Sequence, residues 1–473
     1  MRVNVQLIKA ANDSHLWADT FDRKLTDIFS VESEVAKAIA DQLRAKLTGQ
    51  EEQVIAAKPT NNSEAYDAYL RGLAFEARSG YSKDLKAKAI GFYERAVQLD
   101  PKFALAWARL SRMDALLYFF RVDPTDAARG DAAKRALENA QKLQPNLPET
   151  QLALGYYQYY VLRDYRLAET TFDGVIKRLP GSSEARRALG IIARREGKWG
   201  ESIAYFEQAL ALDPRNVELV DFAADTYAEL RQFPAALKLY DRALDIMPDV
   251  LDTIGAKVSI YVAQGDLQEA AKFLSAINAQ TPSGIFYSKP RQLQFERNYG
   301  EAIRLLQARL AQFHYDSQFD AACDEVYLAF MQRLAGDSAG AKVTAEQARN
   351  TLEQLFRDQP DNESFAAALS QAFAMMGEKD SALRVAERAV MLRPTVKDQL
   401  EGPGFEENLA LIQTIFGENS QAISTITRLL HTPYQGWLYG VAPITPALLR
   451  LDPIWDPLRS DPAFQKLCEE KQK

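Results

Sequence analysis

The stretch from Pro180 to Pro214 decides the fold and reads PGSSEARRALGIIARREGKWGESIAYFEQALALDP. Proline recurs at Pro248 and Pro282, so the four prolines are separated by one constant interval of 34 residues. A period of this length indicates a stack of similar structural units, each in contact with its neighbours, and argues against a single large core.

The residues between these prolines repeat with the same period. Four positions within each 34-residue repeat keep their character from one repeat to the next. The first two carry mainly small residues, the third carries a larger apolar residue, and the fourth carries a small or branched one. In chain order the four sets are Gly190, Ala224 and Val258; Ser202, Ala236 and Ala270; Phe206, Tyr240 and Leu274; and Ala209, Ala243 and Ile277. Small residues let two helices approach closely, and the proline follows the second helix because it cannot continue one. Each unit is therefore predicted to be a helix–turn–helix pair.

This pattern resembles that of the tetratricopeptide-repeat (TPR) family over residues 149–282. The resemblance implies an all-α, right-handed TPR helical solenoid of about ten helix pairs. The predicted parts are 1–48, a β-hairpin plus helix; 49–62, a linker; 63–289, the regular array; 290–358, degenerate helical pairs; 359–442, C-terminal pairs; and 443–473, a capping tail.

In the tail, Thr445, Asp452 and Asp461 each precede a proline, which predicts three capped helix starts. The segment LDPIWDPLR, residues 451–459, resembles the tail that closes many bacterial arrays of this kind. We expect it to cover the apolar end of the array, as terminal units must. The alternative is that Trp455 anchors a partner.

The N-terminal residues follow a different pattern. Val3, Val5 and Leu7 alternate with polar residues, and residues 15–22 (HLWADTFD) read as a second strand, so a β-hairpin is predicted. An amphipathic helix should follow, beginning at Asp27 or Ser30 and ending near residue 47.

Residues 1–48 resemble the end of the TolB-like amino-terminal domain that precedes TPR arrays in multidomain bacterial signalling proteins. The segments that carry the resemblance are VQLI (5–8), HLWA (15–18), FDR (21–23), DIF (27–29) and the helix after them. Two strands alone are marginally stable. The chain is therefore expected to be a fragment of a longer protein, or its hairpin pairs with something else, including a homodimer through residues 1–24.

Composition excludes several classes of function. With 64 acidic and 57 basic residues the net charge is −7, which argues against general nucleic-acid binding. The two cysteines, Cys323 and Cys468, lie far apart without metal-type spacing, and no phosphate-binding loop or catalytic signature is present, so no metal, no cofactor and no enzyme activity are expected. No apolar run suggests direct membrane insertion. We expect a cytoplasmic protein or, if the chain is a fragment, the extracytoplasmic half of a membrane-anchored one.

The candidate binding surface is the concave groove. In the TPR family the first helix of each pair lines this groove, and carrying its groove-facing positions onto three successive pairs gives a tyrosine, an arginine and an acidic patch. The candidate residues are Tyr156, Tyr159, Tyr160, Arg187, Ile191, Arg194, Arg195, Asp221 and Asp225. Arginines suit carboxylate or phosphate, and tyrosines add contact area at low entropic cost. Alternatively, the arginines and acids pair across adjacent helices while the tyrosines pack between repeats.

From this pattern we expect a non-catalytic protein- or peptide-binding scaffold. The resemblance to TolB-like proteins implies the interaction or sensory part of a bacterial signalling system. Two alternatives stay open, a small-molecule sensor that binds in the groove and an oligomeric structural assembly protein.

Overall fold

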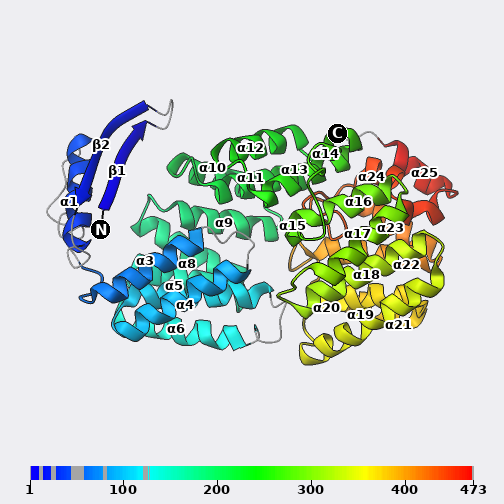
Figure 1. Ribbon diagram of the computed structural model, residues 1–473, viewed down its shortest axis with the longest axis horizontal. Coiled ribbons are helices and arrows are strands. Elements are labelled where there is room, and N and C mark those ends of the chain that lie inside the picture. The colour runs from blue at the N-terminus through cyan, green and yellow to red at the C-terminus, as the bar shows by residue number, and fades with distance from the viewer. Residues whose placement is uncertain are drawn as a thin grey trace. The chain divides into compact units, whose positions relative to one another are not determined.

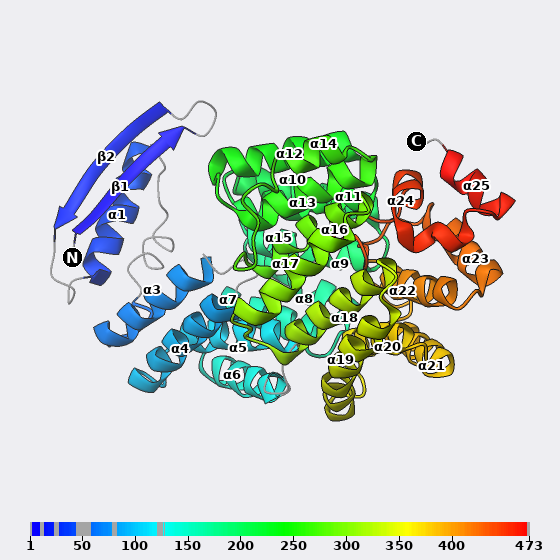
Figure 2. The same cartoon turned by 45° about the vertical axis from the view of Figure 1, so that its right-hand side comes forward.

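The computed structural model describes residues 2–9, 14–22, 28–43, 58–77, 83–120, 126 and 128–470. Within them the protein is an all-α TPR-type solenoid with one small two-stranded sheet (Figures 1 and 2). Two compact units divide the chain, the first comprising Met1–Phe119 and Ala128–Thr171 and the second Phe120–Ala127 and Phe172–Lys473. The predicted start of the first helix at Asp27 and residues 49–57 of the predicted linker lie outside the described residues.

The first unit begins with the hairpin and continues with helix pairs. Its elements are β1 (Arg2–Lys9), β2 (Ser14–Asp22), α1 (Ile28–Gln42), α3 (Ser63–Ala77), α4 (Lys83–Leu99), α5 (Ala104–Phe120), α6 (Arg129–Leu143), α7 (Pro148–Tyr160) and the start of α8 (Tyr165–Arg178). The strands are antiparallel and pair Arg2 with Asp22 and Leu7 with Trp17, so the predicted hairpin is confirmed.

The second unit continues the array and ends in short helices. Its elements are the rest of α8, α9 (Ser183–Arg195), α10 (Trp199–Leu212), α11 (Val217–Glu229), α12 (Phe233–Ile246), α13 (Leu251–Gln264), α14 (Leu267–Ala271), α15 (Ser283–Phe286), α16 (Ser288–Phe295), α17 (Tyr299–Gln312), α18 (Gln318–Leu334), α19 (Ser338–Asp358), α20 (Glu363–Met376), α21 (Lys379–Leu392), α22 (Gly402–Ile415), α23 (Asn419–Leu429), α24 (Pro446–Leu451), a 3₁₀ helix (η3, Pro453–Leu458) and α25 (Pro462–Glu469).

Local chemistry explains where the regular helices begin and how they pack. Ser182 caps α9 by accepting a hydrogen bond from the amide of Ala185 at 3.1 Å. Gly190 is required by close packing, because a Cβ there would lie 3.0 Å from the buried ring of Phe206 on α10. The small residue on the first helix and the aromatic residue on the second therefore form one interlocking contact within the pair.

The turn between the two helices of a unit contains a left-handed residue that recurs with the same period. Arg163, Gly197, Arg231 and Gly265 have φ angles of 52°, 73°, 58° and 85°. Glycine adopts this conformation without steric cost, whereas arginine is strained there. The turn therefore keeps the same left-handed conformation in each of these repeats, even where its residue is arginine.

The tail has the predicted capped starts. Thr445 accepts a hydrogen bond from the amide of Leu448, Asp452 from that of Ile454, and Asp461 from that of Ala463. Trp455 is fully buried in the cluster that also contains apolar residues of α11 to α13 and α22 to α24, so it packs inside the second unit. None of the helices in the described ranges is long and apolar enough to cross a membrane.

Candidate functional site

The candidate residues lie on the first helices of the pairs, as the register predicts. The arginines and Ile191 are on α9, Asp221 and Asp225 are on α11, and the tyrosines are on α7. Helix α7 belongs to the first unit, and α9 and α11 belong to the second, so the candidate tyrosines and the other candidate residues fall in different units.

The arginines of α9 are buried and bind carboxylates. Arg187 pairs with Glu218 at 2.7 Å and Arg194 with Glu229 at 3.2 Å, both on α11. Glu218 is exposed, whereas Glu229 is buried. Ile191, between these arginines, is also buried. The arginine row and the acidic helix α11 thus contact each other directly, in the arrangement of the alternative interpretation given above.

Arg195 reaches a distant part of the same unit. Its two terminal nitrogens bind Asp398 at 2.5 Å and Glu401 at 2.7 Å, in the segment before α22. The backbone amide of Gln399 also donates to the carbonyl of Arg195 at 2.7 Å. Arg393 pairs with both carboxylates and also with Glu363, so two guanidinium groups and three carboxylates form one largely buried cluster.

Further contacts join the ends of α11 and α13 to the C-terminal segment. Arg231 donates to three backbone carbonyls, those of Leu429, Thr432 and Ile444. Thr445 donates from its hydroxyl to the carbonyl of Ala263 at 2.7 Å, and α24 packs against α13 (Figure 1). Residues 429–445, here called the C-terminal segment, therefore contact the carboxyl ends of α11 and α13. These helix ends are where the groove was expected.

The acids of α11 bind hydroxyl groups of neighbouring helices. Asp225 accepts a hydrogen bond from Tyr240 at 2.6 Å, and Asp221 accepts one from Thr253 at 2.8 Å. Burial and then the charge of Asp225 raise the pKa of Asp221 to about 7. Burial also raises the pKa of Asp225, although Arg194 opposes the shift. These carboxyl groups are held inside the array.

The tyrosines of α7 form an aromatic stack in the first unit. Tyr156 stacks on Tyr160 with ring centroids 5.6 Å apart, and Tyr159 meets Tyr160 edge to face at 4.8 Å. Phe119 of α5 packs against both Tyr159 and Tyr160. Tyr156 and Tyr159 are buried, whereas Tyr160 is half-buried, so Tyr160 offers the most ring surface of the three.

Comparison with known proteins agrees with this geometry. Tetratricopeptide-repeat profiles match residues 152–217, 193–252 and 227–285. The chain contains tetratricopeptide repeats. The matched ranges do not include residues 1–48, so the TolB-like resemblance rests on the residues that carry it.

Two curated proteins and one solved structure illustrate the similarity. Over 142 residues the chain is 34% identical to putative adenylate cyclase 3 of Rhizobium meliloti (strain 1021), covering 30% of this chain and 23% of that protein. It is 28% identical over 142 residues to anaphase-promoting complex subunit 6 of Arabidopsis thaliana, covering 29% of this chain and 26% of that one. A tetratricopeptide repeat protein of Parabacteroides merdae ATCC 43184 shares 18% identity and a TM-score of 0.39, over 56% of this chain and 98% of that structure. The chain spans about a quarter of the curated relatives.

Sequence reasoning missed a cluster of three charged residues in the first unit, two of which occupy groove-facing positions. Glu76 on α3 and Arg109 and Arg112 on α5 meet in the first unit, where Arg112 also lies over the ring of Tyr156 at 4.7 Å. The signal was present, because extending the same register back to Gly72 and Ser111 places Glu76 and Arg112 at groove-facing positions.

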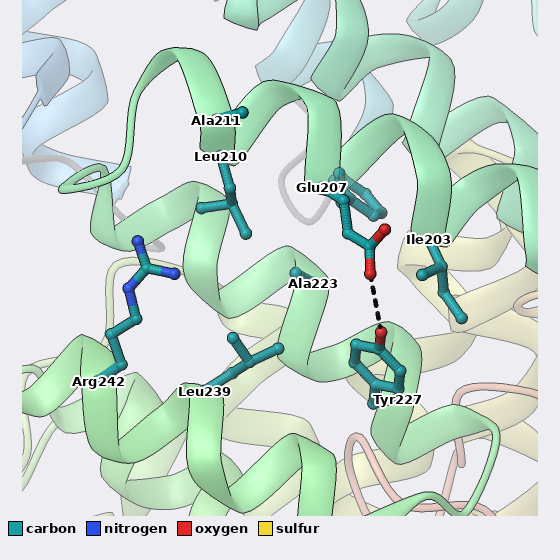
Figure 3. Close-up of a pocket in the computed structure, with 9 residues that line it drawn as sticks. Ile203, Glu207, Leu210, Ala211, Ala223, Tyr227, Leu239 and Arg242 are labelled. Carbon is teal, nitrogen blue, oxygen red and sulfur yellow. Dashed lines mark hydrogen bonds between the residues drawn. The ribbon is translucent and has the colours of Figure 1, made fainter.

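A pocket of 330 Å³ lies between α10, α11 and α12 of the TPR array (Figure 3). Leu210 and Leu239 form apolar walls, Tyr227 donates from its hydroxyl to Glu207 at 3.4 Å on one side, and Arg242 borders the other. This pocket could hold one apolar side chain. It is lined mainly by second helices and includes none of the candidate groove residues.

Metal chemistry has no support in the described ranges. No group of three or more histidine, cysteine, aspartate or glutamate residues there could hold a metal ion. Cys323 and Cys468 are free thiols, and burial raises the pKa of Cys323, which disfavours its reactive thiolate.

Proposed function

We propose that this protein is a non-catalytic scaffold whose TPR array binds a protein or a peptide. The observation that carries the proposal is the line of groove-facing side chains across α3, α5 and α7, formed by Glu76, Arg112 and Tyr156 and continued by Tyr160. Such a line offers a carboxylate, a guanidinium group and aromatic rings to an extended ligand. TPR proteins are generally non-catalytic scaffolds, and the fold fits this function.

Within the candidate set we propose different roles for the two groups. Of the tyrosines, the half-buried Tyr160 offers its ring to the ligand, and the buried Tyr156 and Tyr159 hold that ring in place. The residues of the second unit, which are Arg187, Ile191, Arg194, Arg195, Asp221 and Asp225, would shape the array and act on a ligand indirectly. The burial of Ile191 and of the three arginines supports this division, as do the contacts of the arginines with carboxylates and of the half-buried Asp221 and Asp225 with hydroxyl groups of neighbouring helices.

The test is selection of ligands from a library of random peptides displayed on phage, with the whole chain as bait. We expect an enriched sequence whose synthetic peptide binds with a Kd of about 1–100 μM, and we expect Tyr160→Ala to weaken it about tenfold. The matched control is Tyr157→Ala, which removes a half-buried tyrosine of the same helix that packs beside Ala153 and Leu137. Failure to enrich any peptide that binds in solution would contradict the scaffold function.

We further propose that the scaffold belongs to a bacterial signalling or regulatory system, with residues 1–48 as the end of a TolB-like domain. One curated relative is a bacterial protein named as a putative adenylate cyclase, and the matched part is 23% of its length. A covalently linked effector would then have to lie outside the matched region. This role is a step beyond the peptide-binding function and depends on it.

A second proposal concerns the hairpin, which we infer to be a homodimer element through residues 1–24. The described sheet contains β1 and β2 alone, so each strand has one edge without a strand partner among the described residues. Val5, Leu7 and Trp17 are only half-buried. An open edge of this kind pairs readily with a second copy.

Light scattering after size exclusion tests the dimer. We expect the mass of two chains for the full protein and of one chain for a variant that begins at Lys58. Leu16→Lys, at an exposed strand position, is the point variant, and it should shift the full chain towards monomer. A monomeric full chain at concentrations up to about 100 μM would refute the proposal.

A further inference from the structure

We propose that the groove of the first unit binds the acidic side chains of a peptide at Arg109 and Arg112, and that Glu76 is a built-in competitor for this site. The inference rests on the proposed peptide-binding function and names the chemistry of its ligand.

The first step is the geometry around Glu76. One carboxylate oxygen of Glu76 lies 3.2 Å from Nη1 of Arg109 and 3.5 Å from Nη1 of Arg112, while the other accepts a hydrogen bond from Tyr93. Arg109 and Arg112 are three residues apart on α5, so their side chains lie on one face of that helix. Two guanidinium groups therefore converge on a single carboxylate, which shows that this place accommodates an acidic group.

The second step is access from solvent. The side chains of Arg109, Arg112 and Glu76 are 21%, 15% and 13% exposed, in contrast to the fully buried pair of Arg309 and Asp324 in the second unit. Each of the three side chains thus keeps part of its surface in solvent. An incoming carboxylate can therefore compete with Glu76 without exposing a deeply buried charge.

The third step is the aromatic wall that orients Arg112. Its guanidinium carbon lies 4.7 Å from the ring centroid of Tyr156, which is itself stacked on Tyr160. Stacking fixes the plane of a guanidinium group and leaves its N–H edge for planar acceptors such as carboxylates. The half-buried ring of Tyr160 offers a neighbouring apolar surface for the residue beside the acid.

The charges around the site explain why a competitor matters. Burial raises the pKa of Tyr69, Arg109 opposes this shift, and Glu149 and Glu76 add to it. Glu76 offsets part of the positive charge of Arg109 and Arg112, so a ligand carboxylate gains most when this internal carboxylate is removed. Substitution of Glu76 and substitution of Arg112 should therefore have opposite effects on affinity.

The experiment measures fluorescence anisotropy of a labelled peptide of alternating glutamate and alanine, with the full chain. Its matched control peptide has glutamine in place of glutamate. We expect Arg112→Gln to weaken binding about tenfold, since a charged hydrogen bond is lost. We expect Glu76→Gln to strengthen it about threefold, as removal of a partly exposed ion pair allows. Arg71→Gln, at an exposed arginine of α3 that pairs with Asp67, should leave it unchanged.

A second variant separates charge from shape. Arg112→Lys keeps the positive charge and the fold but loses the planar fork, so it should still weaken binding severalfold. Equal binding of the glutamate and glutamine peptides, unchanged binding by Arg112→Gln, or weaker binding by Glu76→Gln would each overturn the inference. Stronger binding of a phosphoserine peptide than of the glutamate peptide would overturn the assignment to carboxylates.

The phage experiment distinguishes failure of this inference from failure of the proposed scaffold function. If the phage library yields peptides that bind without acidic residues and independently of Arg112, the scaffold function stands and this inference fails. If the library yields nothing, the scaffold function itself fails.

Discussion

Replacing Arg195 with alanine should lower the free energy of unfolding of the second unit by about 3 kcal/mol. Arg195 and its partner Asp398 are 5% and 3% exposed, so the substitution leaves a carboxylate buried beside one remaining cation, Arg393. Removal of one member of a buried ion pair is costly because the other member keeps its desolvation penalty. We would measure urea unfolding by circular dichroism, and hydrogen exchange at the amide of Gln399, which should accelerate.

The matched control is Arg187→Ala on the same helix. Arg187 is almost as buried as Arg195, yet its partner Glu218 is 62% exposed and remains solvated when the arginine is lost. We expect a cost of about 1 kcal/mol. Equal losses for the two variants would show that burial of the partner carboxylate does not decide the effect. The double variant Arg195→Ala/Asp398→Asn should recover part of the loss, since it removes the stranded charge.

The sequence predicted what the repeat encodes locally. Small residues such as Gly190 identify where the two helices of a pair approach closely, and Thr445, Asp452 and Asp461 identify the last helix starts through their side-chain caps. These features depend on neighbours within one unit. Because such contacts recur in each repeat, they produce the periodic sequence pattern, and the pattern predicts them without the structure.

The periodic pattern could not predict the contacts that residues 398–445 make with the ends of α9, α11 and α13. Arg195 binds Asp398 across 203 residues, and Thr445 binds the Ala263 carbonyl across 182. Arg231 occupies the same left-handed turn position as Arg163, Gly197 and Gly265, and its guanidinium group binds three carbonyls of the C-terminal segment. Since arginine also stands at this position in the unit of Arg163, the residue type alone does not predict the contacts of Arg231. Its partners lie outside any periodic pattern.

Replacing Trp455 with alanine should be the most destabilising of the changes proposed for the tail, at about 3–5 kcal/mol. Its indole is fully buried, and its N–H donates to the Tyr439 hydroxyl at 2.9 Å. Tyr439 in turn donates to Asp452, which also accepts from Gln294 of α16 at 2.7 Å. The substitution therefore leaves a cavity and one unpaired acceptor in a network that joins the tail to the array.

Trp455→Phe separates the two contributions, because it retains most of the apolar volume and removes the N–H donor. We expect a smaller loss, about 1–2 kcal/mol. Urea unfolding followed by circular dichroism gives both values, and limited proteolysis should show earlier cleavage within residues 443–470 of the alanine variant. If Trp455→Ala left stability unchanged and abolished ligand binding instead, the tryptophan would be a partner anchor. Since its ring packs among residues of α11 to α13 and α22 to α24, we expect it to hold the terminal segment on the array.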